Sequence, residues 1–522
     1  MAIPRVLVIA GSDSSGGAGL EADQKVLSAH GVYAQTCTTA LTAQNTLGVT
    51  DVHITPPAFL AKQIDACLND IGCDVVKIGM LASAATVEIV GDKLAEWRGQ
   101  VPGAGRVVLD PVMVSTSGHQ LLPGDAVRGM LGRLVRGVEL VTPNVPEAVL
   151  MLKEGSEGDD EVRSPGDLEG LKTLARTVHE KLGPKAVLLK GGHVPMCRRN
   201  GTLVKAMSEE DREVVVDVLY DGVEVELVES AYAKSRNTHG TGCSLASAVA
   251  ANLAQGLELK KAVKRACQYV GVGINTSISF SKGAGPINHF HNMQRMPFVE
   301  GKFVEYLLDR EDVKPVWKKY THHPFANQMG DGTLPVDAFK EYLVQDYLYL
   351  IHFARTNALA AYKSTDMDAI TASAQIVMHI DREMELHLDY CKEFGLSKED
   401  IVKQKESLAC VAYSRYVLDI GQSQDWLALQ MSLAPCLLGY GAAAQRLHAQ
   451  YAEKHDGNKY WKWIENYVAD DYQEAVRVGS ALIERNAANQ SPSRIEELVR
   501  IFIRATEMEV QFWNFGAHCS VE

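Results

Sequence analysis

Residues 237–251, NTHGTGCSLASAVAA, combine two glycines, a cysteine and a run of small residues. Gly240 and Gly242 allow a tight turn and a close approach of the backbone to a ligand. The small residues after Cys243 are typical of a helix start, where free amide groups bind phosphate oxygens. The same amides favour a thiolate, which makes Cys243 a candidate proton acceptor for a substrate hydroxyl. A helix start that merely packs small residues closely would give the same pattern.

A second glycine-rich stretch, GSDSSGGAG, follows the first apolar run of the chain. It lacks the Gly-Lys-Ser/Thr ending of a P-loop, and no acidic residue ends a second strand at the distance that a dinucleotide fingerprint requires. Both nucleotide-binding motifs are therefore rejected. Further along, Gln44 in TALTAQNT offers a donor and an acceptor to a heteroaromatic ring, although a role in a turn explains it equally well.

Two carboxylates stand among apolar residues at helical spacing in the second half of the chain. Asp346 shares a helix face with Phe339, Tyr342, Leu343, Tyr349, Leu350 and Phe353, and Glu509 shares one with Phe502, Ala505, Thr506, Phe512, Trp513 and Gly516. A buried carboxylate is costly unless it is hydrogen-bonded, protonated or placed for a ligand. We expect an aromatic-lined polar pocket inside a helical bundle, with two structural carboxylates as the alternative.

Two further features of this half are ambiguous. Cys436, after Pro435, is a lone cysteine, and most lone cysteines are inert small hydrophobic residues. His379, Glu383 and His387 are spaced to share one helix face, as in some metal sites, but no second helix offers matching ligands. We interpret these three residues as a solvated polar face.

The two halves of the chain follow different patterns. Up to about Ile287, short apolar runs bounded by Gly, Pro, Asp or Asn alternate with helical segments, which predicts an α/β domain with a mostly parallel sheet covered on both faces. Ligands bind at the carboxyl ends of such strands. From about Val304 the pattern is that of an all-α domain. We predict domains at residues 1–290 and 304–522, joined by a linker at 291–303.

Composition limits the classes of function. The 522 residues exceed one domain, and a net charge of -13 gives no general attraction to nucleic acid or to anionic membranes. The ten cysteines contain no C-x-x-C pair, which is typical of reduced thiols. With no secretory signal, we expect a cytoplasmic protein.

Eight motifs in order make the first half resemble the hydroxymethylpyrimidine kinases of the ribokinase superfamily: AGSDSSGGAGLEADQK, TALTAQNT, KIGML, LDPVMVS, TPNVPEA, LLKGGH, THGTGCS and GPINHF. The resemblance implies an ATP- and Mg²⁺-dependent kinase that phosphorylates hydroxymethylpyrimidine and then its monophosphate. It implies that Cys243 accepts the substrate proton. The implied pyrimidine-binding residues are Gly11, Asp23, Gln44, Met80 and Val112. The implied ATP- or phosphate-binding residues are Lys190, Asn144, Gly240, Thr241 and Gly242, and those for Mg²⁺, through water, are Asp110 and Glu147. Pyridoxine as a further substrate remains open.

The second half resembles the TenA family of thiaminase II enzymes through HHPFANQMGDGTL, FKEYLVQDYLYL, AYSRYVLDIG, APCLLGYG, YWKWIENYVADDY and EVQFWNFG. The order of the two domains is similar to that of fungal thiamin-biosynthesis fusion enzymes. The resemblance implies a haem-oxygenase-like helical bundle without a cofactor, with Cys436 as nucleophile and Glu509 as acid and base. The implied pyrimidine-binding residues are Asp346, Tyr349, Tyr413, Tyr440, Tyr467 and Phe512.

The combined expectation is a homo-oligomeric enzyme of thiamin biosynthesis and salvage that acts on small aminopyrimidines and thiamin. It would bind neither nucleic acid nor membranes. The alternative keeps an active kinase but makes the helical half a non-catalytic binding or oligomerisation module.

Overall fold

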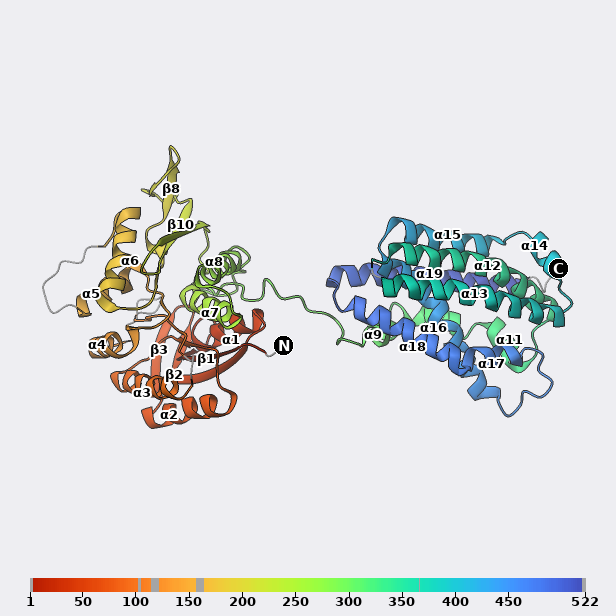
Figure 1. Ribbon diagram of the computed structural model, residues 1–522, viewed down its shortest axis with the longest axis horizontal. Coiled ribbons are helices and arrows are strands. Elements are labelled where there is room, and N and C mark those ends of the chain that lie inside the picture. The colour runs from red at the N-terminus through yellow and green to blue at the C-terminus, as the bar shows by residue number, and fades with distance from the viewer. Residues whose placement is uncertain (1–2, 102–104, 114–121, 156–163, 366, 519–522) are drawn as a thin grey trace. The chain divides into compact units, whose positions relative to one another are not determined.

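The computed structural model describes residues 3–101, 105–113, 122–155, 164–365 and 367–518. The chain divides into two compact units, Met1–Met293 and Gln294–Glu522, and this division falls inside the segment predicted as a linker. Figure 1 shows a unit that combines strands and helices, followed in the sequence by a unit built of helices.

The first unit is built on one sheet with the strand order β3-β2-β1-β4-β5-β6-β7-β10-β8-β9, and β11 pairs with β10. The strands are β1 (Arg5–Asp13), β2 (Tyr33–Asn45), β3 (Gly48–Ile54), β4 (Val75–Ile78), β5 (Val107–Leu109), β6 (Leu140–Val141), β7 (Val187–Leu189), β8 (Met196–Arg199), β9 (Thr202–Lys205), β10 (Val214–Tyr220) and β11 (Val225–Ala231). The run from β2 to β7 is parallel, and β3, β8, β9, β10 and β11 pair antiparallel.

Helices cover both faces of this sheet. They are α1 (Gly19–Ala29), α2 (Pro57–Ala66), α3 (Ala84–Gln100), α4 (Gly124–Met130), α5 (Val145–Gly155), α6 (Leu168–Leu182), α7 (Thr241–Ala254) and α8 (Leu259–Asn275), with short turns η1 (Cys67–Ile71), η2 (Leu131–Val135) and η3 (Gly191–His193). Along β1, Leu7 and Ile9 pack with α2 to α6, whereas Val6 and Val8 pack with α1, α7 and α8. Because side chains alternate along a strand, continuous apolar strands bury both faces, and the predicted covered parallel sheet is confirmed.

The second unit is helical, as predicted. Its helices are α9 (Phe303–Asp309), α10 (Lys314–Thr321), α11 (Pro324–Asp331), α12 (Val336–Lys363), α13 (Met367–Glu393), α14 (Lys398–Lys403), α15 (Leu408–Ser423), α16 (Trp426–Tyr451), α17 (Trp461–Val468), α18 (Asp470–Ala487) and α19 (Pro492–His518). The long helices α12, α15, α16 and α19 contact one another.

One helix in the described part of the chain, α16, is long and apolar enough to cross a membrane. However, 78% of its apolar window is buried inside this unit, which is typical of a core helix.

Candidate active sites

A cavity of about 750 Å³ opens at the carboxyl ends of the parallel strands. Every kinase-site residue predicted from the sequence except Asp23 lines it: Gly11, Gln44, Met80, Asp110, Val112, Asn144, Glu147, Lys190, Gly240, Thr241, Gly242 and Cys243. These residues come from the carboxyl ends of β1 and β2, from the segments that follow β4 to β7, and from the starts of α5 and α7. The fold therefore brings them together as the rule for ligand sites at strand ends requires.

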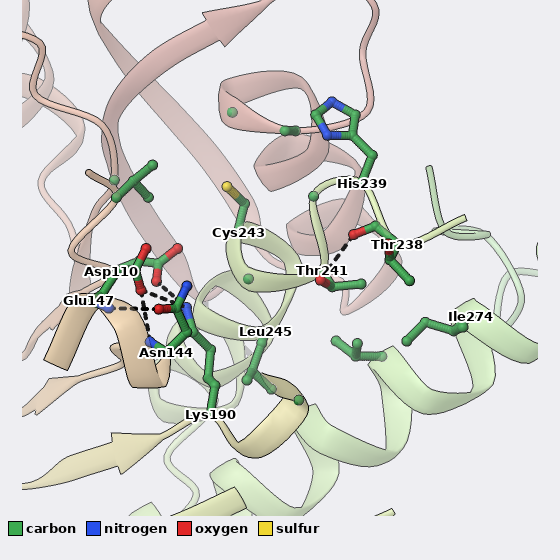
Figure 2. A pocket seen from close by; sticks show the side chains of 18 of the residues that line it. Asp110, Asn144, Glu147, Lys190, Thr238, His239, Thr241, Cys243, Leu245 and Ile274 are labelled. Atoms are coloured by element: carbon green, nitrogen blue, oxygen red, sulfur yellow. Dashed lines mark hydrogen bonds and ion pairs between the residues drawn. The ribbon is translucent and has the colours of Figure 1, made fainter. Parts of the chain in front are cut away.

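One end of the cavity holds a buried group of opposite charges. Lys190 Nζ lies 2.8 Å from Asp110 Oδ1 and 3.7 Å from Glu147 Oε2. Thr142 donates a further hydrogen bond of 3.0 Å to the same oxygen of Asp110. Figure 2 shows the side chains of Asp110, Glu147 and Lys190 pointing toward one another.

Asn144 and Glu147 fix each other at the start of α5. The backbone N–H of Asn144 donates to Glu147 Oε2, and the backbone N–H of Glu147 donates to Asn144 Oδ1, both at 2.8 Å. This reciprocal capping holds the carboxylate toward the cavity. Burial raises the pKa of Glu147 to about 7, although the nearby Lys190 ammonium opposes the rise.

The donor set beside Lys190 suits Mg²⁺. Asp110 and Glu147 are two buried carboxylates that both lie near the Lys190 ammonium. Mg²⁺ prefers oxygen ligands and usually combines one or two carboxylates with waters and phosphates. These residues fit the ion.

The N-terminus of α7 faces the same charged group. Gly240 has a positive φ of 75°, and a Cβ there would lie 1.9 Å from the Gly17 carbonyl oxygen. A Cβ at Gly242 would lie 3.1 Å from Lys190 Nζ. Gly240 is thus required by close backbone approach, and at Gly242 the helix start lies next to the Lys190 ammonium, as in a phosphate site.

Cys243 lines the cavity, where its surroundings favour the protonated thiol over the thiolate. Burial raises the pKa of Cys243 to about 11, and the charges of Asp23 and Asp110 add to this. The Lys77 ammonium and a backbone hydrogen bond with Gly19 oppose the rise without cancelling it. That the α7 amides favour a thiolate stays a prediction, and desolvation acts against it.

The other end of the cavity is shaped by Gly11, Met80 and Gln44. A Cβ at Gly11 would lie 2.1 Å from Met80 Cε, so the glycine leaves space for the methionine. Gln44 Nε2 lies 3.4 Å from His239 Nε2, which is 2.8 Å from Asp13 Oδ2. The hydrogen bonds from His239 and Ser15 lower the pKa of Asp13 although burial opposes this, so a charged carboxylate orients the imidazole.

His239 was missed in the sequence, and Asp13 was noted only as part of a polar loop, although both stand inside quoted motifs. Their separation of 226 positions leaves no local signal for the contact.

Asp23 does not line the cavity, in contrast to the prediction. It lies on the face of α1 that packs on the sheet, where its Oδ2 accepts a hydrogen bond of 2.8 Å from Lys77 Nζ. Both side chains are fully buried, and Ser247 donates to Asp23 Oδ1 at 2.7 Å. Lys77 itself lines the cavity. Lys77 was missed in the sequence. The sign of its importance was a single charged residue in an otherwise apolar strand.

The helical unit gathers a second group of predicted residues around Glu509. Its carboxylate is 1% exposed and accepts hydrogen bonds from the hydroxyls of Tyr413, at 2.8 Å, and Tyr440, at 3.2 Å. Burial raises the pKa of Glu509 to about 8, although the two tyrosine hydroxyls oppose the rise. This carboxyl can therefore exchange a proton near neutral pH.

Asp346 is the second carboxyl of this site. Burial raises its pKa, and its nearest charge partner is His387, whose Nδ1 lies 3.8 Å from Asp346 Oδ2. His387 is half-buried, and its Nε2 lies 3.1 Å from the Leu343 carbonyl oxygen. The interpretation of His387 as part of a solvated face is wrong, while the side chains of His379 and Glu383 lie outside the described residues.

The predicted aromatic residues form one cluster beside these carboxyls. Tyr349 stacks on Tyr413 at 4.9 Å between ring centroids and approaches Phe512 at 5.9 Å. Tyr440 stacks on Tyr467 at 5.2 Å. The cluster therefore joins rings from α12, α15, α16, α17 and α19.

The sequence leaves Tyr460 and Tyr472 as alternatives to Tyr467, and the hydroxyl of each binds a backbone carbonyl. The hydroxyl of Tyr472 donates to the Leu437 carbonyl at 3.0 Å, and that of Tyr460 donates to the Leu334 carbonyl. Tyr320 was missed in the sequence: its ring lies 5.9 Å from that of Tyr440, and its buried hydroxyl has no hydrogen-bond partner among the described residues.

Cys436 is partly buried on α16. Burial and the carboxylates of Glu509 and Asp346 raise the pKa of its thiol well above the usual value. A protonated thiol next to carboxyls that can accept a proton is a possible nucleophile whose activation depends on those carboxyls.

Both parts of the chain are similar in sequence to known proteins. Residues 13–288 match the model of the family described as phosphomethylpyrimidine kinase, and residues 310–519 match that of the TENA/THI-4/PQQC family. A Schizosaccharomyces pombe relative, provisionally named a hydroxymethylpyrimidine/phosphomethylpyrimidine kinase, is 43% identical over 98% of this chain and 91% of its own length. The Saccharomyces cerevisiae hydroxymethylpyrimidine/phosphomethylpyrimidine kinase THI20 is 32% identical over 98% of this chain and 95% of its own length. A solved Bacillus subtilis pyridoxal kinase in complex with ADP is 28% identical over 55% of this chain and 98% of its own, with a TM-score of 0.46.

Proposed function

This chain belongs to the phosphomethylpyrimidine kinase family and carries a TenA-family domain after the kinase, and on that premise we propose how the described residues divide the work of a fused enzyme of thiamin biosynthesis. The kinase is a hydroxymethylpyrimidine and phosphomethylpyrimidine kinase that uses ATP. The roles of individual residues, the Mg²⁺ ion and the substrate of the helical domain are our proposals.

The convergence of Lys190, Asp110 and the start of α7 in one cavity carries the kinase proposal. Lys190 and the amides of Gly240, Thr241 and Gly242 bind the phosphates of ATP, and Asn144 holds Glu147 in place. Asp110 and Glu147 hold Mg²⁺, which when bound neutralises phosphate charge. Phosphoryl transfer depends mainly on such positioning and charge neutralisation.

The pyrimidine occupies the other end of the same cavity. Gly11, Met80 and Val112 shape a slot for the ring, and Gln44 pairs with its polar edge. The reacting hydroxyl or phosphate oxygen of the substrate faces Cys243. Its O–H bond breaks toward the thiolate, which has lost its own proton to solvent, while the oxygen bonds to the γ-phosphorus and the bond from that phosphorus to ADP breaks.

The helical domain hydrolyses a C–N bond of an aminopyrimidine, in our proposal. Asp346 binds the ring nitrogen and exocyclic amine, and the stacked tyrosines and Phe512 enclose the ring. Glu509 takes the thiol proton as the Cys436 sulfur bonds to the ring, and it gives this proton to the amine as the C–N bond breaks. The same carboxylate then takes a proton from the water whose oxygen replaces the sulfur, and that proton returns to the Cys436 thiol. The carboxyl with a pKa of about 8 supports this alternation between acid and base.

We also propose that the protein is a cytoplasmic homo-oligomer acting on small aminopyrimidines and thiamin. Large apolar side chains on the helical unit support an interface: Tyr362 is 86% exposed and Leu408 is 88% exposed.

Mass spectrometry of products tests both activities in one reaction. The protein receives Mg-ATP and 4-amino-5-aminomethyl-2-methylpyrimidine, and we expect hydroxymethylpyrimidine diphosphate and ammonia. Cys436→Ala should stop ammonia release while added hydroxymethylpyrimidine is still phosphorylated twice. If the wild-type protein leaves both the aminomethyl substrate and thiamin unchanged, the helical domain is a binding or oligomerisation module instead.

A further inference from the structure

The kinase cavity contains one buried cation that the proposed roles do not use. Lys77 is the third residue of β4, and its side chain is fully buried although it lines the cavity. A Cβ built at Gly79 would lie 3.1 Å from Lys77 Nζ, so the ammonium lies against the turn that leaves the strand. A buried lysine without a function is normally replaced by an apolar residue at small cost, so this charge needs an explanation.

The position of the ammonium is fixed from behind. Asp23 binds it at 2.8 Å from α1, and Ser247 binds the second oxygen of Asp23 at 2.7 Å from α7. One direction of the ammonium is used by Asp23, and no other hydrogen bond to Nζ is found within the described ranges. The chain Ser247–Asp23–Lys77 therefore supports a buried cation whose remaining N–H groups have no hydrogen-bond partner among the described residues.

We propose that Lys77 is a positioning residue of the kinase, which acts through Cys243 by holding a buried positive charge beside this thiol, with Asp23 and Ser247 as its support. The inference rests on the proposed role of Cys243. Ser247 and Cys243 both lie in the first two turns of α7, so one helix positions both the hydroxyl that binds Asp23 and the thiol. The charge favours release of the thiol proton before transfer and stabilises the negative charge that remains on sulfur.

The charges around Cys243 agree in sign with this role. Lys77 is the group that most strongly opposes the raised pKa of Cys243, and Asp23 acts in the other direction. Burial alone would lower the pKa of Lys77, but Asp23, Cys243 and Asp110 raise it overall, so the lysine keeps its charge. The lysine and its support thus have opposite effects on the thiol.

Because Lys77 and Asp23 have opposite effects on the Cys243 thiol, the reactivity of this thiol distinguishes the proposed role from a purely structural ion pair. The probe is iodoacetamide, and the alkylation rate of the Cys243 peptide is followed by mass spectrometry across pH in Asp23→Asn and in Lys77→Met/Asp23→Asn. Neither variant leaves an unpaired carboxylate in the core, and the negative charges of Cys243 and Asp110 still favour a charged Lys77 in Asp23→Asn. We expect the double variant to be alkylated about tenfold more slowly than Asp23→Asn at pH 8, with its rate rising at higher pH, because one pKa unit changes the thiolate fraction about tenfold. Asp23→Asn itself should react at least as fast as the wild type.

Kinase assays on the same variants separate this inference from the proposed role of Cys243. The kcat of the double variant should be about tenfold lower than that of Asp23→Asn, with the KM for ATP unchanged. Replacing Lys77→Met by Lys77→Arg in the double variant should recover part of the lost kcat. Equal alkylation rates in Asp23→Asn and the double variant would overturn the inference. If Cys243→Ala keeps full kinase activity, the proposed proton acceptor fails, while the alkylation rates still decide whether Lys77 controls the thiol.

Discussion

The hydroxyl of Tyr413 donates a hydrogen bond of 2.8 Å to Oε1 of Glu509, although the two residues are 96 positions apart in the sequence. Tyr413 belongs to α15 and Glu509 to α19, and the contact exists because these helices pack against each other. The bond holds a buried carboxyl whose protonation state controls the proposed hydrolysis.

Tyr413→Phe should move the pH dependence of the hydrolase to higher pH. The tyrosine hydroxyl lowers the pKa of Glu509, so its removal lets burial raise that pKa further above about 8. In the pH profile of kcat/KM, we expect the limb that reports the titration of Glu509 to shift to higher pH by on the order of one unit. Tyr460→Phe is the matched control, because that hydroxyl binds the Leu334 carbonyl instead. A limb that does not move in Tyr413→Phe would contradict the assignment.

Glu509→Gln should stabilise the helical unit at alkaline pH. Burial raises the pKa of Glu509 from 4.5 to about 8 in the folded state. Below pH 4.5 the carboxyl is protonated in both states, and as pH rises toward 8 the unfolded state loses the proton more easily, so the folded state becomes relatively less stable. Glutamine does not titrate. The variant should therefore gain on the order of 1–4 kcal/mol over the wild type between pH 5 and pH 8.5.

Urea unfolding followed by tryptophan fluorescence measures this difference. The signal reports mainly the helical unit, because Trp97 is the only one of the six tryptophans that precedes residue 294. A constant difference between the two proteins across pH would show that Glu509 does not change its protonation on folding.

Lys190→Met should abolish kinase activity and leave the hydrolase intact. The variant removes the cation that neutralises Asp110 and opposes the raised pKa of Glu147, so this pKa should rise above about 7. We expect a loss of about 100-fold or more in kcat, as for other groups that stabilise charge in the transition state. Lys185→Met is the control, since its partner Glu139 lies in an exposed pair. Both activities are measured on one preparation, and a kinase that keeps most of its rate would refute the role of Lys190.

Gly11→Ala should weaken pyrimidine binding without unfolding the protein. The new Cβ would lie 2.1 Å from Met80 Cε, the far end of a flexible side chain that lines the cavity, so Met80 must shift within the site. The KM for hydroxymethylpyrimidine should rise about tenfold, or about 1.4 kcal/mol, while the KM for ATP stays the same. Gly132→Ala serves as control, because nothing lies within 4 Å of a Cβ there. An unchanged KM in Gly11→Ala would place the pyrimidine elsewhere.

The sequence by itself placed several of the candidate residues relative to one another. Gly240, Gly242 and Cys243 are adjacent, so their relation follows from local backbone geometry. The places of Asp346 and Glu509 follow from the 3.6-residue period, which sets one face of a helix whatever packs against it. The covered parallel sheet follows from apolar runs that bury both faces of each strand.

Only the tertiary structure decided how the charged groups are paired and which of them are ionised. Asp23 lies behind Lys77 rather than in the cavity, and His239 meets Asp13 across the fold. Burial raises the pKa of the Cys243 thiol, and His387 Nδ1 lies 3.8 Å from Asp346 Oδ2 inside the bundle. Electrostatic free energies depend on distances in space and on desolvation, and neither is set by spacing along the chain.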